Sequence, residues 1–375
     1  MLSHSMDIAF YAPLKSPNHP VPSGDRLMAR QLIEILGVRG HRVDLVSEFR
    51  AFLPEQTSPT GERDAQAARE VERISTEWER RLALGERLPD LWFTYHLYYK
   101  APDLIGPALC RRFDIPYVTA EASYSHRRNL GQWVEAQEMV IDAVRLAATN
   151  ICFTERDGRG LAEVVPDVRL SRLFPFIDST PYLARAPAPE PGRLVAVGMM
   201  RPGNKFACYA ALAEALKQIA HRDDWHLMAI GDGPMRDEVE ALFNGALAGR
   251  VEWMGLKSAD EVSALLSTAA ILTWPGVSEA YGLSYLEGQA SGVPVVAENG
   301  AGVPEVVTDG IGGILTPPGD AAAYAAAIER LLDDETERLR LGQGARDFVV
   351  SQRSITAAAD RLDEIITAIG AKEKA

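Results

Sequence analysis

The sequence predicts an α/β fold with two doubly wound, Rossmann-like domains that face each other across a cleft. A chain of 375 residues is too long for one ordinary core and suits two domains of common size. In both halves, short apolar runs alternate with helical patterns, which is typical of parallel sheets covered by helices. Between the halves, residues 184–192 contain Pro187, Pro189 and Pro191 and show no apolar periodicity, so they predict a semi-rigid linker.

The predicted strands are apolar runs without polar alternation, as expected of strands that are buried on both faces. In the first half they cover residues 7–13, 41–47, 91–96, 116–123 and 150–155. In the second half they cover residues 193–198, 225–231, 250–255, 270–276, 293–299 and 312–316. Residues 65–84 and 355–370 each carry an apolar stripe at helical spacing. The sequence therefore predicts domains at 1–185 and 186–354, followed by a C-terminal helix at 355–375 that packs back toward the N-terminal domain.

Composition and charge exclude several classes of protein. Apolar residues make up 47% of the chain, yet no run approaches the ~18 apolar residues of a membrane span. No secretory signal is evident, and the three scattered cysteines are typical of a reducing compartment, which favours the cytoplasm. The net charge is −13, of which −11 falls on residues 186–375. A nucleic-acid partner is therefore not expected, and an anion bound by the second half needs a few local donors.

The most informative segment is residues 275–320. It leaves a strand at Pro275-Gly276 and enters a helical pattern near Gly282, and the free amides of a helix start favour an anion. Glu279 and Glu287 are eight residues apart, which on one helix would separate them by ~12 Å in rise. That spacing suits two ends of an elongated, hydroxyl-bearing ligand, because carboxylates accept hydrogen bonds from hydroxyls. Two solvated surface acids are the alternative.

A second candidate lies between a predicted strand and a helix. Arg201 and Lys205 are four residues apart across a Pro-Gly-Asn turn, so their donors can converge on a diphosphate. The pattern lacks the glycines and Lys-Ser/Thr ending of a Walker loop, and alone it also fits a surface loop. The sequence contains no Asp-x-Asp motif, and its histidines lack metal-ligand spacing, so no metal ion and no cofactor are predicted. Two cations and a helix start can stabilise a leaving phosphate without a metal.

Taken together, these motifs resemble the family-4 glycosyltransferases of the GT-B fold. The resemblance is carried by Glu279, Gly282 and Glu287 in order, followed by Gly-Val-Pro-Val-Val at 292–296 and Gly-Val-Pro-Glu at 302–305. Ala280 departs from the family, in which a glycine is more usual at this position.

The resemblance implies transfer of a hexose-type sugar from a nucleotide-diphosphate sugar to an acceptor hydroxyl, with retention of configuration by front-face attack. Glu279 would contact the transferred sugar and Glu287 the ribose hydroxyls. Amides near Gly282 and Leu283 would meet the diphosphate, and Arg201 and Lys205 would neutralise the departing nucleoside diphosphate. Donor binding is thus assigned to the C-terminal domain and the acceptor side to the N-terminal domain.

The residues that would contact the acceptor are harder to predict from the sequence. Gly24 resembles part of the family's glycine-rich first loop, which approaches the diphosphate. His96 ends a strand where the family often has a catalytic histidine, although a buried structural histidine fits equally. Glu121 stands where the family's Val-Thr-x-His segment has its histidine. Glu121 or His126 is therefore expected to orient an acceptor hydroxyl, with a structural hydrogen-bonding role as the alternative.

Several alternatives remain open at this stage. The chain also fits a catalytically silent nucleotide-sugar-binding protein, or another GT-B enzyme such as a sugar-phosphate synthase or epimerase. The sequence does not distinguish UDP, GDP and ADP, nor a saccharide, a lipid-linked molecule and a small molecule as the acceptor. The basic clusters at 111–112 and 126–128 favour solvated faces, with an anionic acceptor or the inner face of a membrane as the alternative.

Overall fold

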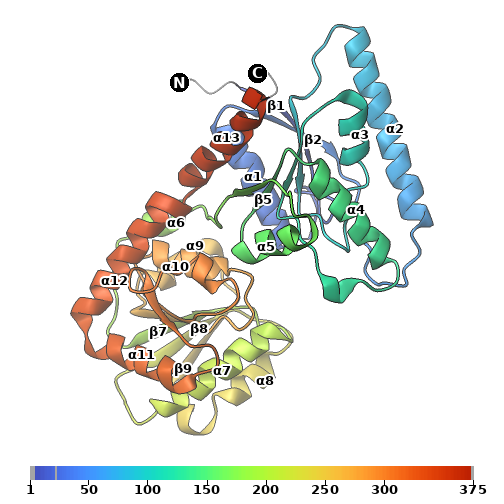
Figure 1. The fold of residues 1–375 in the computed structure, drawn as a ribbon. Coiled ribbons are helices and arrows are strands. Elements are labelled where there is room, and N and C mark those ends of the chain that lie inside the picture. Colours follow the sequence, from blue (N-terminus) through green and yellow to red (C-terminus); the bar gives the residue numbers. More distant parts are fainter. Residues whose placement is uncertain (1–4, 22, 373–375) are drawn as a thin grey trace. The chain divides into compact units, whose positions relative to one another are not determined.

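The computed structural model describes residues 5–21 and 23–372 and contains two six-stranded parallel sheets with helices packed on them (Figure 1). The chain divides into two compact units, Met1–Phe174 with Ala358–Ala375, and Pro175–Ala357. The division therefore falls before the proline-rich segment in which the sequence placed the domain boundary.

The first unit holds a sheet with the strand order β2-β1-β3-β4-β5-β6. Its strands are β1 (Asp7–Tyr11), β2 (Arg42–Ser47), β3 (Leu91–Tyr95), β4 (Tyr117–Ala120), β5 (Thr149–Cys152) and β6 (Leu170–Arg172). Five of them match predicted runs. The sixth, β6, was missed because an edge strand of three residues with an exposed leucine has neither the length nor the burial that produces an apolar run.

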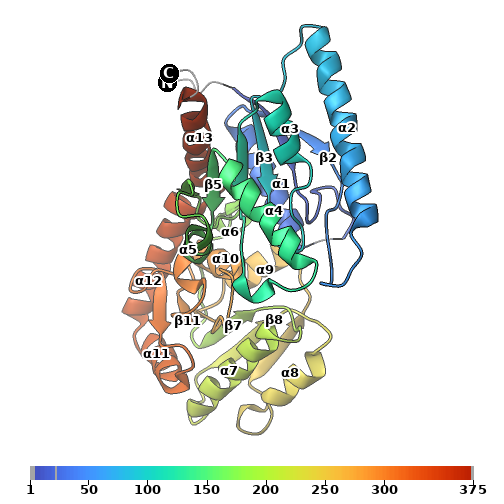
Figure 2. The same cartoon turned by 45° about the vertical axis from the view of Figure 1, so that its right-hand side comes forward.

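Helices cover this first sheet. They are α1 (Gly24–Val38), α2 (Gly61–Ala83), α3 (Gly106–Phe113), α4 (Trp133–Leu146), α5 (Glu155–Val164) and α13 (Ile355–Lys372), together with the 3₁₀ turn η1 (His126–Arg128). The long, charged helix α2 lies beside α3 (Figure 2) and buries Trp78, whose ring packs edge-on against Trp92. From residue 358 onward, α13 belongs to this unit, where Asp363 Oδ1 lies 2.9 Å from His41 Nε2.

A buried carboxylate fixes the carboxyl end of β3. Asp103 accepts hydrogen bonds from the hydroxyls of Thr94 (2.5 Å) and Tyr117 (2.8 Å) and from the amides of Ile105 and Gly106. These donors come from β3, β4 and the start of α3. The network therefore holds these three elements together near the carboxyl end of β3.

The second unit holds a sheet with the order β12-β11-β10-β7-β8-β9. Its strands are β7 (Arg193–Val197), β8 (His226–Ile230), β9 (Val251–Gly255), β10 (Ile271–Thr273), β11 (Val295–Glu298) and β12 (Gly313–Thr316), and all six match predicted runs. Counted within the unit, this is the strand order of the dinucleotide-binding fold.

The helical segments of the second unit connect and cover these strands. They are α6 (Thr180–Leu183), α7 (Asn204–Gln218), α8 (Arg236–Leu242), η2 (Gly245–Leu247), α9 (Ala259–Leu266), α10 (Leu283–Ala290), η3 (Val303–Glu305), α11 (Ala321–Asp333), α12 (Glu335–Phe348) and the π-helical turn η4 (Val349–Arg353).

Each sheet has a point at which the strand order reverses. In the first unit, β1 lies between β2 and β3, and in the second, β7 lies between β8 and β10. Ligands of open parallel sheets bind at the carboxyl ends of the strands that flank such a point. The loops after β1 and β3, and those after β7 and β10, are therefore the expected functional positions of the two units.

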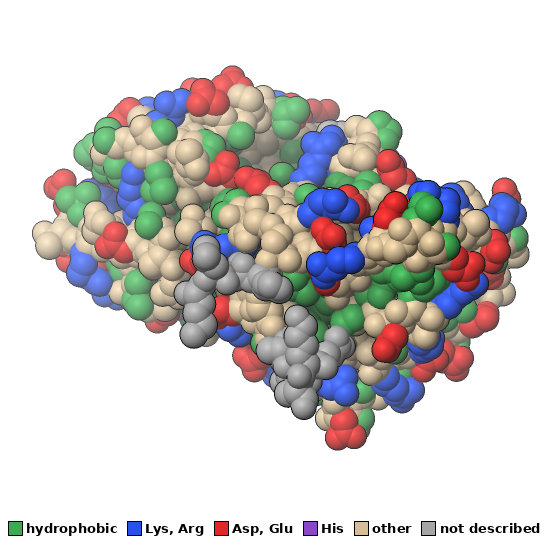
Figure 3. Space-filling model, turned by 90° about the horizontal axis from the view of Figure 1, so that it is seen from above, with side chains coloured by type: hydrophobic (Ala, Val, Ile, Leu, Met, Phe, Trp, Pro, Cys, Tyr) green, Lys and Arg blue, Asp and Glu red, His purple; other side chains and the backbone are tan. Residues whose placement is uncertain are grey.

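The state of the cysteines and the distribution of charge on the surface can be compared with what the composition predicted. Cys110, Cys152 and Cys208 are free and buried. None of the described helices is both long and apolar enough to cross a membrane. On the face shown in Figure 3, acidic and basic side chains are interspersed among apolar ones.

Candidate active site

An ion pair lies at the reversal point of the second sheet. Lys205, in the first turn of α7, places its Nζ 2.6 Å from Oε2 of Glu279, in the loop between β10 and α10. The Glu279 side chain is only 15% exposed, and the Lys205 ammonium also lies 5.6 Å from the centre of the Trp274 ring. The structure thus brings together two residues that the sequence predicted from separate motifs.

A close backbone contact shapes the loop that carries Glu279. The amide of Gly302 donates to the carbonyl of Glu279 (3.0 Å), and a Cβ at position 302 would lie 1.4 Å from the carbonyl oxygen of Ala280. Ser278 adopts a φ of 53°, a left-handed conformation that non-glycine residues rarely take. Residue 302 must therefore be glycine for the loop to keep this path, which gives the predicted Gly-Val-Pro-Glu turn a physical role.

The start of α10 adjoins this loop. Gly282 is the N-cap, with a φ of 75°, and a Cβ there would lie 2.8 Å from the Tyr285 ring. Leu283 is the first helical residue, and the first amides of a helix have no partner within it, so they are available to an anion. The Tyr285 hydroxyl donates to the carbonyl of Trp274 (2.9 Å) and ties α10 to the end of β10.

Glu287 lies further along α10 and has a different partner. Its pKa is raised by burial, and a hydrogen bond with the Tyr182 hydroxyl on α6 partly opposes that shift. The two glutamates of the motif thus occupy separate environments, with Glu279 paired to a cation and Glu287 to a phenol. Tyr182 was not predicted, because a helix of four residues leaves no periodic signal.

Arg201 lies in the loop after β7, and its side chain is exposed. Its carbonyl accepts from the amide of Phe206 (3.1 Å), so the backbone turns tightly toward α7. Among the described residues, no contact joins its guanidinium to an acid or to the Lys205–Glu279 pair. The two cations predicted to bind the diphosphate therefore differ in the structure. Lys205 is paired with Glu279, whereas the side chain of Arg201 faces solvent.

At the reversal point of the first sheet, His96 meets an acid that the sequence analysis did not single out. Its Nδ1 lies 3.1 Å from Oδ1 of Asp25, the second residue of α1. Burial lowers the pKa of His96, but Asp25, Glu121 and Asp157 outweigh burial, so the net shift of the pKa is upward. The pKa of Asp25 is lowered, chiefly by its contact with His96. In the sequence, the only feature that could have drawn attention to Asp25 was its place in the first turn of a helix capped by Ser23.

Glu121 joins this group. His96 (φ 61°) and Glu121 (φ 56°) both take left-handed conformations directly after their strands. Burial raises the pKa of Glu121, and the charge of His96 opposes that shift. Strained backbone that surrounding structure maintains is concentrated at functional sites. We therefore name His96, Asp25 and Glu121 the acid–histidine cluster.

Two other predicted residues are placed differently. Gly24 is the first residue of α1, directly before Asp25, and a Cβ there would meet no atom within 4 Å. His126 is exposed in η1 and packs edge-on against Tyr124. Among the described residues, none of the contacts of His126 is with the acid–histidine cluster.

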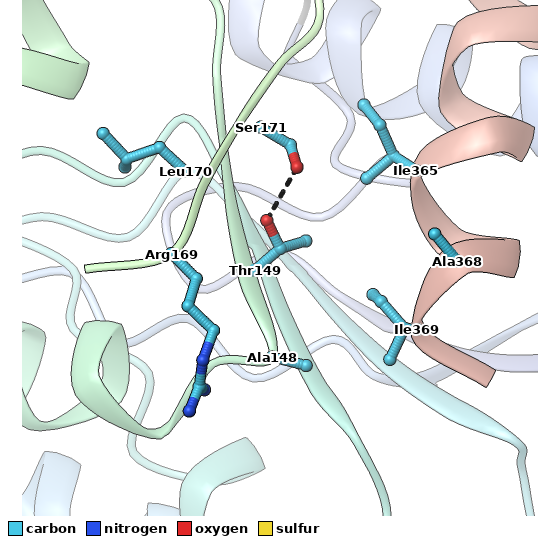
Figure 4. A pocket seen from close by; sticks show the side chains of 8 residues that line it. All are labelled: Ala148, Thr149, Arg169, Leu170, Ser171, Ile365, Ala368 and Ile369. Carbon is cyan, nitrogen blue, oxygen red and sulfur yellow. Dashed lines mark hydrogen bonds between the residues drawn. The ribbon is translucent and has the colours of Figure 1, made fainter. Parts of the chain in front are cut away.

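A further hollow lies at the other end of the first sheet from the acid–histidine cluster. It has a volume of about 480 Å³ at the amino ends of β5 and β6, beneath α13 (Figure 4). The hydroxyls of Thr149 and Ser171 lie 2.9 Å apart on one side, and Ile365, Ala368 and Ile369 line the other. Because functional loops of parallel sheets follow the opposite strand ends, we do not assign this hollow to the active site.

Among the described residues, no group of three or more His, Cys, Asp or Glu side chains could hold a metal ion.

Comparison with protein families finds a match within the second unit. Residues 191–334 match the family model described as Glycosyl transferases group 1. This segment is similar to group 1 glycosyl transferases. It contains Arg201, Lys205, Glu279 and Glu287, and therefore the complete set of charged residues predicted for donor binding.

Curated relatives of the group 1 domain are glycosyltransferases by name. The chain is 33% identical over 159 residues to the alpha-D-kanosaminyltransferase of Streptomyces kanamyceticus, covering 42% of this chain and 41% of that protein. It is 27% identical over 290 residues to the D-inositol 3-phosphate glycosyltransferase of Frankia alni, covering 68% and 70%. The chain thus spans about two fifths of the first relative and a larger part of the second.

Solved structures resemble the chain over nearly its whole length. Sucrose-phosphate synthase from Thermosynechococcus elongatus has a TM-score of 0.71 at 20% identity, covering 98% of this chain and 100% of that one. Anabaena HepE in complex with UDP has a TM-score of 0.71 at 15% identity, covering 97% and 100%. These likenesses and the two parallel sheets confirm the predicted GT-B fold.

Proposed function

We propose that this protein is a retaining glycosyltransferase that moves a hexose-type sugar from a nucleotide-diphosphate sugar to an acceptor hydroxyl. The observation that carries the proposal is the Lys205–Glu279 pair, at the strand reversal of a group 1 domain and beside the start of α10. The named glycosyltransferase relatives and the UDP bound to Anabaena HepE support it.

The geometry suggests a division of roles. The Lys205 ammonium, with Arg201 and the amides at the start of α10, would bind the diphosphate and stabilise its charge as it departs. Glu279 would then accept hydrogen bonds from hydroxyls of the transferred sugar, and Glu287 from those of the ribose. In this scheme the bond between the anomeric carbon and the phosphate oxygen breaks, the acceptor oxygen bonds to the same face, and the leaving phosphate accepts the acceptor's proton.

The acid–histidine cluster is proposed to serve the acceptor. A protonated His96 can donate a hydrogen bond to an oxygen of the acceptor, and Glu121 can accept one from a hydroxyl. We retain His96 as a catalytic candidate and assign Asp25 the role of orienting the imidazole.

We further propose that transfer needs no divalent cation, since two side-chain cations and a helix start supply positive charge at the phosphates. Activity measured with excess EDTA and with added Mg²⁺ tests this point. Equal rates are expected, whereas loss of activity in EDTA that Mg²⁺ restores would contradict the proposal.

A thermal-shift screen with UDP, GDP, ADP and their sugars tests the proposed function most directly. A ligand at 100 times its Kd is expected to stabilise the folded protein by about 2.7 kcal/mol. One nucleotide should raise the Tm, and its sugar should be consumed in the presence of an acceptor. If no nucleotide raises the Tm, the proposal fails; if one binds but none of its sugars is consumed, the protein is a silent nucleotide-sugar binder.

A further inference from the structure

Aromatic rings and cationic side chains form a connected group at the edge of the first sheet where His96 lies. We call it the aromatic–cationic cluster, and its members are Phe52, Tyr98, Tyr99, Trp133, Arg50, Lys100 and Arg128. All of them follow the carboxyl ends of β2, β3 or β4 in the chain. Ligands bind at this edge of a parallel sheet, so the position favours a substrate-binding role.

One side of the cluster is built around Phe52 and Trp133. The Arg50 guanidinium lies 4.3 Å from the centre of the Phe52 ring. The Lys100 ammonium lies 6.0 Å from the same ring and 5.1 Å from the Trp133 ring. The Trp133 indole donates to the carbonyl of Leu53 (3.3 Å), which joins the segments after β2 and β4.

The other side leads to the acid–histidine cluster. The Tyr99 ring lies edge-on to Trp133 at 4.9 Å, and the Arg128 guanidinium lies 5.9 Å from Tyr99. Tyr98 lies between Tyr99 (5.1 Å) and His96 (5.2 Å). Both tyrosines are partly exposed, so their rings are accessible to a ligand.

The cations of the cluster are not neutralised by acids. Among the described residues, none of the three has a carboxylate within 4 Å, whereas Arg73 and Arg112 of the same unit pair with Glu70 and Glu79. The chain as a whole carries a net charge of −13. Three positive charges gathered without acidic partners in an acidic protein therefore create a local preference for an anion.

We propose that the aromatic–cationic cluster binds an anionic group of the acceptor, so that the acceptor is a sugar or polyol with a phosphate or carboxylate. This inference rests on the proposed glycosyl transfer and specifies its second substrate. The guanidinium groups of Arg50 and Arg128 present the forked donors that phosphate and carboxylate accept. The partly exposed tyrosine rings offer apolar faces to a sugar ring, and the anion, held here, leaves an acceptor hydroxyl near His96.

The anion can belong to a soluble molecule or to a lipid headgroup, since the chemistry of the contact is the same. Two arms of one experiment separate these sources. The first measures calorimetric binding of glycerol 3-phosphate, glucose 6-phosphate and inositol monophosphate, each beside its neutral parent. The second measures sedimentation with vesicles of phosphatidylglycerol and of phosphatidylcholine.

The variants Arg50→Gln and Arg128→Gln remove one cation each, and Arg127→Gln is the matched control. Arg127 neighbours Arg128 in η1 and is also exposed, but only Arg128 lies over a ring of the cluster. At least one anionic probe, or phosphatidylglycerol vesicles alone, should bind at least ten times more tightly than its neutral counterpart. Arg50→Gln and Arg128→Gln should each weaken that binding about tenfold, as expected for a lost charge-assisted hydrogen bond. Arg127→Gln should leave it within twofold.

Nucleotide binding is measured on the same samples, so that failure of this inference is distinguished from failure of the proposed function. If a nucleotide binds but no anionic probe or vesicle exceeds its neutral counterpart, the inference is overturned. It is also overturned if Arg127→Gln weakens binding as much as Arg128→Gln, because the attraction would then come from a diffuse surface charge.

Discussion

At the scale of single residues, Lys205 is the most informative position in the candidate site. Its ammonium pairs with Glu279 and lies over Trp274, so it is fixed where the diphosphate is proposed to leave. Lys205→Ala should lower kcat about 10²- to 10³-fold, because it removes a charge that stabilises the leaving group. Steady-state rates of donor consumption provide the measurement.

Lys217→Ala is the control for this substitution. Lys217 lies on the same helix and forms a similar ion pair with Glu214, also at 2.6 Å, but on an exposed surface. Its removal should leave kcat within twofold. Rates for Lys205→Ala within twofold of the unaltered protein would count against any role of Lys205 in the transfer step.

The contact between His96 and Asp25 predicts a pH-dependent stability. Asp25, Glu121 and Asp157 raise the pKa of His96 against the effect of burial, and the pKa of Asp25 is lowered. Stabilisation from protonated His96 is complete below its unfolded pKa of about 6.5 and is lost as pH rises through the higher folded value. Stabilisation from ionised Asp25 is present above its unfolded pKa of about 3.9 and is lost as pH falls through the lower folded value.

Asp25→Asn should therefore lower the Tm most between about pH 4 and pH 6.5, with a smaller effect at higher pH. Asp237→Asn is the control, because Asp237 is likewise the second residue of a helix but is exposed and has no recorded partner among the described residues. NMR titration should also place the pKa of His96 lower in Asp25→Asn than in the unaltered protein. An unchanged pKa of His96 would rule out Asp25 as the residue that orients the imidazole.

A functional residue could be predicted from the sequence only where it belongs to a motif of residues that are close together in the chain. Glu279 and Lys205 lie in motifs with fixed spacing, so each was found, although their 2.6 Å contact spans 74 residues of sequence and had no local trace. Asp25 and Tyr182 acquire significance only through partners that the fold brings near. Their contacts with His96 and Glu287 depend on tertiary structure, which spacing along the chain does not encode.

At the scale of elements, the inner strands of both sheets were predictable because burial on two faces produces uninterrupted apolar runs, whereas the edge strands β2 and β9 are only partly buried. The exception, β6, shows the limit of that signal at a short sheet edge. The loop between β10 and α10 shows another limit. The path of this loop depends on the close approach of Gly302 to the backbone of Ala280. The sequence predicted Gly302 only as part of a turn.

Gly302→Ala tests whether this loop holds Glu279 in place. The φ of Gly302 is −97°, which alanine tolerates. The substitution should therefore act only through the overlap of the new Cβ with the carbonyl of Ala280. Relief of that overlap should move the loop, lower the Tm by several degrees and weaken donor binding about tenfold. Gly300→Ala is the control, since its nearest neighbour would be a side-chain carbon of Pro318 at 3.4 Å. Equal donor affinity in both variants would show that the loop position does not matter for binding.

At the scale of the whole molecule, the division into two units assigns the end of the chain to the first unit. The helix α13 contributes Ile366 there, which is fully buried, whereas Leu331 of α11 is fully buried in the core of the second unit. Replacing such a residue by alanine costs about 2–5 kcal/mol, which in a unit of this size lowers its Tm by roughly 10 °C. The sequence predicted the helix from its apolar stripe, but the assignment to a unit depends on long-range contacts.

Calorimetry of Ile366→Ala and Leu331→Ala, with and without the nucleotide that the screen identifies, tests this assignment. The nucleotide is proposed to bind the second unit, so it should raise only the transition that Leu331→Ala lowers. Ile366→Ala should lower a transition that the nucleotide leaves unchanged. These outcomes follow because a ligand stabilises the cooperative block that contains its site, and Ile366 lies outside the second unit. If instead both substitutions lowered one transition that the nucleotide raises, the two units would unfold as a single block.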